Sequence, residues 1–329
     1  MALPSDGCID AHAHLVPAKL VEATERAAGN LPNVTVSRPE GGGVAISFPS
    51  TQAVRPIPPA VLDRERSHAW MDAHGIAAQV VGVWADLFAY DLPPREAAYW
   101  TRMVNELLVE ETHASGRMAP LAILPLQDTT LALQELDRAL DLGYPGVTIG
   151  CSAGADELDH DRLDEVWAAL ADRRVPVVMH PGFRTSDVRA TAYGLPNTLG
   201  RAYDTDVAVA RLLYSGRLAK HPGVRLVLMH GGGAVPYLWG RMQRNHALGD
   251  GPADPADGLA CLYFDSVVYR EQALSYLVDF AGADRVLLGS DYPFPIMDPE
   301  PLRVVRELVP PDDVRARICA DNARALFVR

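Results

Sequence analysis

Short apolar runs alternate with segments of helical periodicity along most of the chain, from residue 76 onward. This alternation is typical of βα units built around a parallel sheet. Together with one apolar run near the N-terminus, it predicts eight strands, over residues 8–12, 76–84, 118–124, 145–149, 175–180, 224–230, 260–266 and 285–290. The sequence therefore predicts an α/β fold, a (β/α)8 TIM barrel.

Segments of helical periodicity fill the intervals between these strands. They are expected near residues 63–74, 95–115, 129–142, 161–173, 204–219, 234–247, 270–281 and 299–308, with a final pair near 311–327. End signals support this placement, because Asp128 and Thr129 stand where a helix N-cap is expected and Gly143 stands where a helix C-terminal glycine is expected.

Two stretches interrupt the repeating pattern. Residues 33–49 alternate around three consecutive glycines, Gly41 to Gly43, and predict a small β-hairpin after the first strand, in an insertion over about residues 30–60. Residues 182–203 are expected to form a long loop after the fifth strand, and loops of this length are usually functional. We expect residues 1–329 to form a single barrel domain that carries these additions.

Composition and charge exclude several classes of protein. Hydrophobic residues make up 48% of the chain and charged residues 22%, an ordinary globular mixture. The formal net charge of -12 and the lack of a basic run argue against nucleic-acid binding. The N-terminus lacks a basic start followed by an apolar stretch, and no run of about 18 apolar residues follows, so we expect a cytoplasmic protein without membrane contact. The four cysteines form no CxxC pair, which argues against a disulfide framework and a thiolate zinc site.

Five residues with the chemistry of metal ligands fall at the ends of predicted strands. His12 and His14 end the first strand, two residues apart, so alternation places both side chains on one face. His180 ends the fifth strand, His230 ends the sixth, and Asp291 follows the eighth. Active sites of such barrels lie at the carboxyl ends of the strands. Neutral imidazole and carboxylate ligands suit zinc, and also manganese or iron.

These motifs admit other interpretations. Each histidine could instead be a core residue paired to a backbone carbonyl, but five such coincidences at the correct strand ends are improbable. The run Gly150–Gly154 matches G-x-S-x-G around Ser152, yet the next helix is expected only near Asp161, whereas a nucleophile elbow requires an immediate helix. A barrel that keeps its metal only for stability or for binding is a further alternative, but such a site has no need of His230.

Four segments carry a resemblance to a known family: CIDAHAH, VVMHPG, LVLMHGGGAVPYLWGRM and LLGSDYPFP. Together they resemble the amidohydrolase superfamily, in the branch related to 2-amino-3-carboxymuconate-6-semialdehyde decarboxylase. The resemblance implies that His12, His14, His180 and Asp291 bind one divalent metal ion, zinc in the first place and manganese as an alternative. It also implies that His230 is the catalytic acid or base, with Asp291 sharing in proton transfer.

The same resemblance implies a substrate and a partner. Arg55 and Arg241 correspond to substrate-binding arginines, and Phe294 to a residue of the pocket. The second arginine would reach the site of a neighbouring subunit, which implies a homodimer. The implied reaction is a metal-dependent, non-oxidative decarboxylation of a small aromatic or dienoic carboxylic acid. A metal-dependent hydrolase of a lactone, amide or ester, or a hydratase, stays open as the alternative, because residues 182–203 depart from the decarboxylase pattern.

Overall fold

The computed structural model describes residues 3–49, 55–182, 188–307 and 312–328. Eight strands form one parallel sheet in the order β1-β4-β5-β6-β9-β10-β11-β12. Their bounds are β1 (Cys8–His14), β4 (Ile76–Gly82), β5 (Met118–Ala122), β6 (Gly146–Ile149), β9 (Pro176–Met179), β10 (Arg225–Leu228), β11 (Leu262–Asp265) and β12 (Val286–Leu287). Every strand overlaps its predicted range, and the predicted TIM barrel is confirmed.

The first strand and the segment after the last strand close the barrel. Ala13 forms a parallel bridge with Tyr292. The backbone N–H of Asp291 donates to the carbonyl of His12 at 2.8 Å, and the N–H of His14 donates to the carbonyl of Tyr292 at 2.8 Å. These hydrogen bonds hold together two segments almost 280 residues apart in the chain, and both segments carry candidate site residues.

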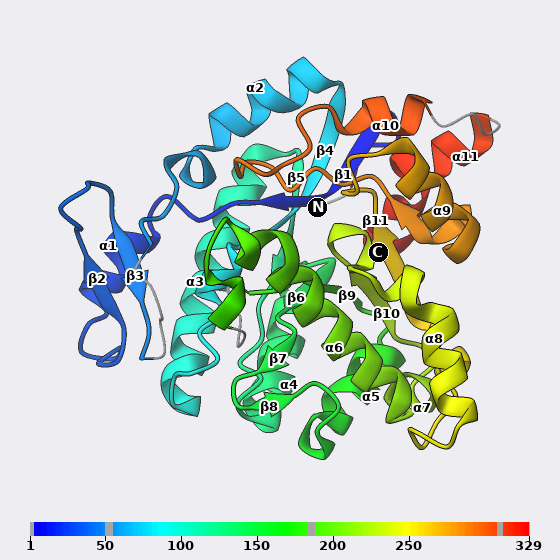
Figure 1. The fold of residues 1–329 in the computed structure, drawn as a ribbon. Coiled ribbons are helices and arrows are strands. Elements are labelled where there is room, and N and C mark those ends of the chain that lie inside the picture. The colour runs from blue at the N-terminus through cyan, green and yellow to red at the C-terminus, as the bar shows by residue number, and fades with distance from the viewer. Residues whose placement is uncertain (1–2, 50–54, 183–187, 308–311, 329) are drawn as a thin grey trace.

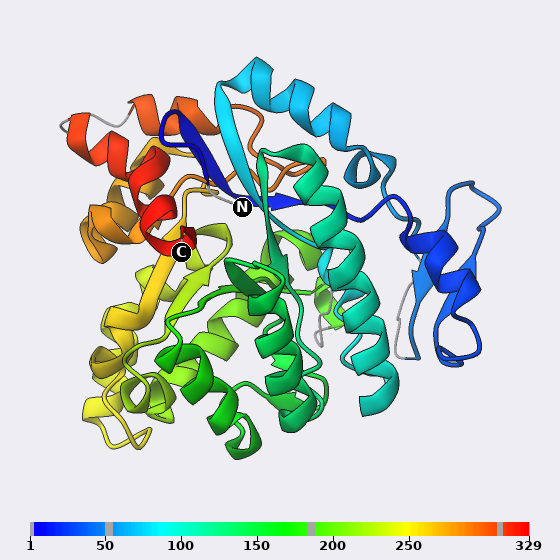
Figure 2. The ribbon, with the colours of Figure 1, turned by 180° about the vertical axis from the view of Figure 1, so that it is seen from behind.

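Helices surround the sheet, as Figures 1 and 2 show from opposite sides. They are α2 (Arg64–His74), α3 (Pro94–Ser115), α4 (Thr129–Asp141), α5 (Asp164–Asp172), α6 (Arg201–Tyr214), α7 (Arg217–Lys220), α8 (Val235–Ala247), α9 (Glu271–Ala281), α10 (Pro301–Glu307), α11 (Asp312–Ala316) and α12 (Asn322–Phe327). Asp128 caps α4 as expected, because its side chain accepts from the N–H of Leu131 at 2.9 Å. None of the helices in the described ranges is long and apolar enough to span a membrane.

The helix predicted over residues 204–219 is two helices, and this prediction was wrong in detail. Gly216 lies between α6 and α7 with φ of +76°, a left-handed conformation that ends one helix before the next begins. Helix α6 also begins earlier than predicted, at Arg201, because a π-helical turn over Pro196–Gly200 runs directly into it. The predicted long loop over 182–203 is therefore helical in its last third, and its residues 183–187 lie outside the described part of the chain.

The sheet buries side chains on both of its faces. Val178 and Val227 belong to one buried cluster, which also contains Phe327 of the C-terminal helix α12. Val177 and Leu228, their neighbours in sequence, belong to a second and larger cluster that includes the buried sides of the surrounding helices. This division follows from the period of two along a strand, and it explains why the strands appear in the sequence as continuous apolar runs.

The predicted insertion after the first strand is present. Strands β2 (Thr35–Ser37) and β3 (Ala45–Ser47) pair in antiparallel fashion, which confirms the β-hairpin. A short helix that the sequence pattern did not reveal, α1 (Leu20–Arg26), lies beside the hairpin, and both project from the barrel in Figures 1 and 2. Residues 50–54 of the expected insertion lie outside the described residues.

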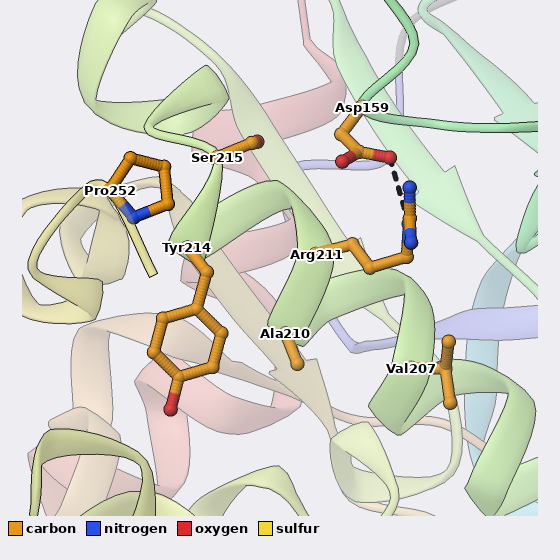
Figure 3. Close-up of a pocket in the computed structure, with 7 residues that line it drawn as sticks. All are labelled: Asp159, Val207, Ala210, Arg211, Tyr214, Ser215 and Pro252. Atoms are coloured by element: carbon orange, nitrogen blue, oxygen red, sulfur yellow. Dashed lines mark hydrogen bonds and ion pairs between the residues drawn. The ribbon is translucent and has the colours of Figure 1, made fainter. Parts of the chain in front are cut away.

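A surface hollow of about 450 Å³ lies along α6, and no residue at the carboxyl ends of the barrel strands lines it. Figure 3 shows its lining, in which Arg211 of α6 forms an ion pair with Asp159 at 2.9 Å. The lining is formed by Asp159, Val207, Ala210, Arg211, Tyr214, Ser215 and Pro252. None of these residues belongs to the histidine set that the sequence singles out.

Candidate metal centre

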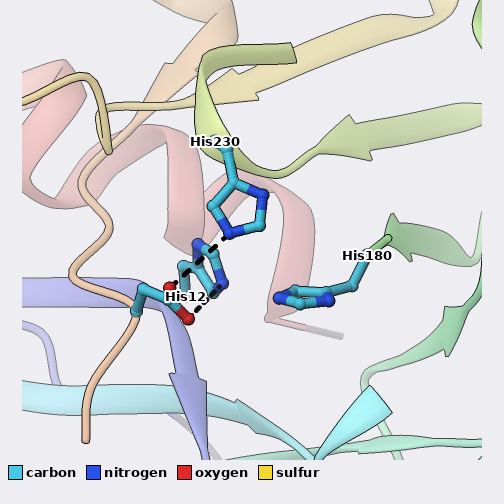
Figure 4. A group of neighbouring side chains, drawn as sticks. His12, His180 and His230 are labelled. Carbon is cyan, nitrogen blue, oxygen red and sulfur yellow. Dashed lines mark ion pairs between the residues drawn. The ribbon is translucent and has the colours of Figure 1, made fainter. Parts of the chain in front are cut away.

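The structure brings together the five residues that the sequence singles out at the strand ends. One side-chain donor atom from each of His12, His180, His230 and Asp291 lies within 4.8 Å of the others. Nε2 of His14 lies 3.1 Å from Oδ1 of Asp291, so this residue joins the same group. Figure 4 shows the imidazole rings of three of these histidines directed toward a common space. All five residues lie at the carboxyl ends of their strands, as expected for a barrel active site.

Asp291 lies at the middle of this group. Its Oδ1 is 3.3 Å from Nε2 of His12 and 3.1 Å from Nε2 of His14, and its Oδ2 is 3.6 Å from Nε2 of His230. The residue is buried and has φ of +61°, a left-handed conformation that few residues other than glycine adopt. Burial alone would raise the pKa of Asp291, but the charge of His12 lowers it well below its usual value. The carboxylate is therefore ionised.

Asp265 is a functional residue that the sequence analysis missed. It ends β11 and is fully buried, and its Oδ2 lies 2.5 Å from Nδ1 of His12. The same carboxylate accepts from the backbone N–H of His230 at 3.0 Å and of Gly231 at 2.6 Å. It thus orients one imidazole and fixes the backbone that carries another. The available signal was its place at the end of the seventh predicted strand, the position that the other site residues share.

The two carboxylates control the protonation of the imidazoles. Burial alone would lower the pKa of His12, but Asp291 and Asp265 raise it to about 10. Burial, together with the neighbouring imidazoles, holds the pKa of His180 well below its usual value. His180 is therefore neutral, the form in which imidazole binds metals, whereas a cation bound by Nε2 of His12 would have to displace the proton that the two carboxylates favour there.

The donor atoms fit a metal ion. Nδ1 of His180 donates to the carbonyl of Pro181 at 2.9 Å and Nδ1 of His12 is held by Asp265, which leaves each Nε2 facing the shared space. Both Nε2 atoms are buried and make no hydrogen bond among the described residues, although that of His12 lies 3.3 Å from Oδ1 of Asp291. Leaving a buried polar atom unsatisfied costs about 1–3 kcal/mol, and a cation bound by these nitrogens and Asp291 would remove this cost.

The glycine run after His230 serves a sharp turn of the backbone. His230 has φ of +57° and Gly231 has φ of +63°. A Cβ atom on Gly231 would lie 2.4 Å from Cγ1 of Val268, so only glycine fits at this position. The turn directs the imidazole of His230 back toward Asp291. The side chain of His230 is 19% exposed and that of His14 is 4% exposed, so His230 is the more accessible of the two histidines.

Two of the three expected substrate residues, Phe294 and Arg55, lie near the histidines. Phe294 packs near His14, with ring centroids 4.9 Å apart, and its ring lies 6.4 Å from that of Trp84. The guanidinium carbon of Arg55 lies 4.9 Å from the centroid of a Trp84 ring, and Arg55 forms an ion pair with Asp86. These residues form a wall that leads outward from the histidines, which we call the aromatic wall. Trp84 is a part of it that the sequence analysis missed.

Two other residues from the sequence analysis lie apart from the buried group. Arg241 is exposed on α8 and takes no part in it. Ser152 begins β7 (Ser152–Ala153), which pairs with β8 (Asp156–Glu157) in a short hairpin. No helix follows Ser152 directly, so the architecture of a nucleophile elbow is absent from this described segment.

Comparisons with known proteins identify the family and the fold. The amidohydrolase family model matches residues 9–329. The chain is 30% identical to 6-methylsalicylic acid decarboxylase of Aspergillus aculeatus, over 98% of this chain and 96% of the relative. It is 26% identical to 2-amino-3-carboxymuconate-6-semialdehyde decarboxylase of Dictyostelium discoideum, over 91% and 85%. A dihydroxybenzoic acid decarboxylase of Polaromonas sp., solved with bound manganese, shares the fold with a TM-score of 0.79 and 24% identity, over 98% and 97%.

Replacement of Asp265 by asparagine is expected to weaken divalent metal binding by about 10- to 100-fold, because the amide cannot hold His12 as a carboxylate does. Titration of metal-depleted protein with Mn²⁺ or Zn²⁺ measures the change. The matched control is Asp206→Asn, which alters a carboxylate of α6 that accepts from the N–H of Ala234, in the turn after His230. Equal affinities in wild type and Asp265→Asn would contradict the role given to Asp265.

Proposed function

The chain belongs to the amidohydrolase family, and we propose that it is a metal-dependent, non-oxidative decarboxylase of a small aromatic or dienoic carboxylic acid. One observation carries the proposal: buried imidazole nitrogens without hydrogen-bond partners converge with Asp291 at the mouth of the barrel. Relatives that align over nearly the whole chain are decarboxylases of such acids. The aromatic wall beside the histidines suits a flat, unsaturated substrate.

We assign His12, His14, His180 and Asp291 to the binding of one divalent ion. The donor set suits zinc, and manganese is the alternative, supported by the manganese bound in the Polaromonas relative. When bound, the ion supplies positive charge that orients an oxygen of the substrate and stabilises negative charge developing during the reaction. The donor atoms that lie within 4.8 Å of one another are those of His12, His180, His230 and Asp291, whereas His14 joins the group through its contact with Asp291, so the role of His230 requires a separate test.

His230 supplies the proton in this proposal. Its Nε2 lies 3.6 Å from Asp291, its backbone is held by Asp265, and its ring is more exposed than those of His12 and His14. When the bond between the carboxyl group and the substrate carbon breaks, the electron pair stays on that carbon and CO2 leaves. The imidazolium form of His230, stabilised by the charge of Asp291, then donates a proton to that carbon in place of the carboxyl group and is left as neutral imidazole.

The aromatic wall orients the substrate. Phe294 and Trp84 offer ring faces beside His14. Arg55 lies against Trp84 and is oriented by its ion pair with Asp86, so its guanidinium can hold a carboxylate with two parallel hydrogen bonds. The proposed binding mode stacks the substrate on aromatic rings while an arginine fixes its charged end.

We further propose that the protein is a cytoplasmic homodimer in which Arg241 completes the site of the partner subunit. Arg241 is exposed on α8, where a second chain has access to it. Tyr237 and Leu238 on the same helix are also exposed, at 81% and 37%. Exposed aromatic and aliphatic side chains beside an arginine suit a protein interface.

Removal of the metal ion tests the proposed function. Treatment with a chelator is expected to abolish CO2 release from aromatic and dienoic carboxylates, and Zn²⁺ or Mn²⁺ is expected to restore it. Elemental analysis establishes the metal content of each sample, and CO2 is measured directly. Full activity in metal-depleted protein would contradict a role for the ion. Metal-dependent uptake of water without CO2 release would instead identify a hydrolase or hydratase.

Replacement of His230 by alanine separates proton transfer from metal binding. The variant is expected to keep about one metal ion per chain and to lose at least ~100-fold in turnover, the usual scale for a general acid or base. Metal content and turnover are measured on the same preparation. Loss of the ion would reassign His230 as a ligand, and near-normal turnover would remove it from the mechanism.

Mixed dimers test the role of Arg241. Arg241→Ala and His12→Ala are each expected to be inactive alone, while subunit exchange between them should restore about one quarter of wild-type activity, since half of the dimers hold one intact site. Light scattering of wild type gives the oligomeric state. No recovery after proven exchange would show that Arg241 acts within its own chain or not at all.

A further inference from the structure

Three polar side chains lie buried next to the candidate metal centre, and the proposed chemistry does not use them. They are those of Asp10 in β1, Gln79 in β4 and Ser290, which directly precedes Asp291. Each of the three residues is at most 1% exposed. A buried carboxyl group is costly unless it is hydrogen-bonded, so the partners of Asp10 show what this group does.

The carboxyl group of Asp10 accepts three hydrogen bonds. Its Oδ1 accepts from the backbone N–H of His12 at 3.1 Å. Its Oδ2 accepts from Nε2 of Gln79 at 3.0 Å and from Oγ of Ser290 at 2.6 Å. Gln79 faces Asp10 in the register of β1 and β4. Asp10 therefore joins β1, β4 and the segment after β12, where the barrel closes.

Ser290 extends these contacts to both sides of Asp291. Its hydroxyl group donates to Asp10 and accepts from the backbone N–H of Tyr292 at 3.0 Å. Its own carbonyl accepts from the N–H of Asp298 at 2.8 Å. Ser290 and Tyr292 are the two neighbours of Asp291 in the chain, so the backbone is held before and after this residue.

The backbone of Asp291 requires such support. Its φ of +61° is a left-handed conformation that a residue with a side chain keeps only where the surrounding structure holds it. The N–H of Tyr292 belongs to the peptide group that follows Asp291, and the hydroxyl group of Ser290 fixes the direction of that peptide group. The side chain of Asp291 then faces Nε2 of His12 and of His14.

We propose that Asp10 and Ser290 are positioning residues that act in series on the metal centre. Asp10 fixes the hydroxyl group of Ser290, and this hydroxyl group holds Asp291 in the left-handed conformation that directs its carboxylate to the ion. Asp10 also holds the backbone N–H of His12, so one carboxyl group aligns two ligands. The inference rests on the proposed function only through the assignment of Asp291 and His12 as ligands.

Titration of metal-depleted variants with Mn²⁺, followed by electron paramagnetic resonance of the free ion, tests the proposal. Asp10→Asn and Ser290→Ala are each expected to weaken binding by at least ~10-fold, the usual scale for a residue that orients a ligand. Because both act through one hydrogen bond, the double variant is expected to bind within about 2-fold of the weaker single variant. Losses that multiply in the double variant, or an unchanged affinity in either single variant, overturn the proposal.

The visible absorption of bound Co²⁺ separates positioning from a general structural role, because it reports the arrangement of the ligands around the ion. Ser290→Ala is expected to shift the absorption bands, since Asp291 is no longer held. Ser290→Thr keeps the hydroxyl group and is expected to restore the wild-type bands. Unchanged bands in Ser290→Ala overturn the proposal even if Asp10→Asn does not fold, and so does a Ser290→Thr variant as impaired as Ser290→Ala.

Ser266→Ala is the matched control. The hydroxyl group of Ser266 is also buried and accepts from the N–H of Gly289 at 3.1 Å. Its loss removes a buried hydrogen bond to the same segment without affecting either neighbour of Asp291. The melting temperature of the metal-free protein is expected to fall as in Ser290→Ala, while Mn²⁺ affinity and Co²⁺ absorption stay as in wild type. An equal loss of Mn²⁺ affinity in both variants would overturn the specific role of Ser290.

The outcome can be distinguished from that of the test for CO2 release. A wild type that binds Mn²⁺ through Asp10 and Ser290 but releases no CO2 keeps the positioning residues and removes the decarboxylase assignment. CO2 release with a Mn²⁺ affinity that depends on neither residue gives the reverse result. A wild type that takes up no divalent ion overturns the metal centre and the positioning residues together.

Discussion

The buried carboxylates of Asp291 and Asp265 are the groups on which the rest of the site depends. Four imidazoles lie close together at the barrel mouth, where an unpartnered ring nitrogen is costly. Asp291 faces Nε2 of three of these rings, and Asp265 holds Nδ1 of His12 from the other side. Without the two carboxylates, the neighbouring imidazole rings would repel one another electrostatically. With them, the cluster has the charge and the lone pairs that a divalent cation requires.

Closure of the barrel places these groups in register. The backbone N–H of Asp291 donates to the carbonyl of His12, and this hydrogen bond joins the two ends of the sheet. The same contact therefore fixes the carboxylate of Asp291 relative to the imidazole of His12. Asp265 performs a similar task between β11 and the turn after β10, because it holds the side chain of His12 and accepts from two backbone N–H groups of that turn. The same hydrogen bonds therefore hold the fold and the site. They restrict the positions of the imidazole rings, as catalytic geometry requires.

The sequence predicted the fold and the histidine cluster well because both depend on local periodicity. Strand ends can be located from apolar runs, and barrel topology then brings those ends together. The sequence did not predict Asp265, Trp84 or Arg201, which donates to the same carbonyl oxygen as Nδ1 of His180. Asp265 reaches His12 across 253 residues, and nothing in its own neighbourhood distinguishes it from a strand terminus. Arg201 was hidden because residues 182–203 were expected to form a loop, whereas Pro196 begins a helical turn that leads into α6.

The buried group of histidines and carboxylates, the centre, and the residues around the opening of the barrel, the mouth, differ in how much variation they tolerate. Groups of the centre are buried and share partners, so a change in one of them alters the others, and such a set tolerates little variation. Residues of the mouth contact the centre through few atoms: Phe294 through one ring contact, and Arg201 through the carbonyl of Pro181. They can differ between proteins that keep the same centre. Arg201 lies in the stretch 182–203, where this sequence departs from the decarboxylase pattern, so a substitution there can alter the opening of the barrel while the buried group stays the same.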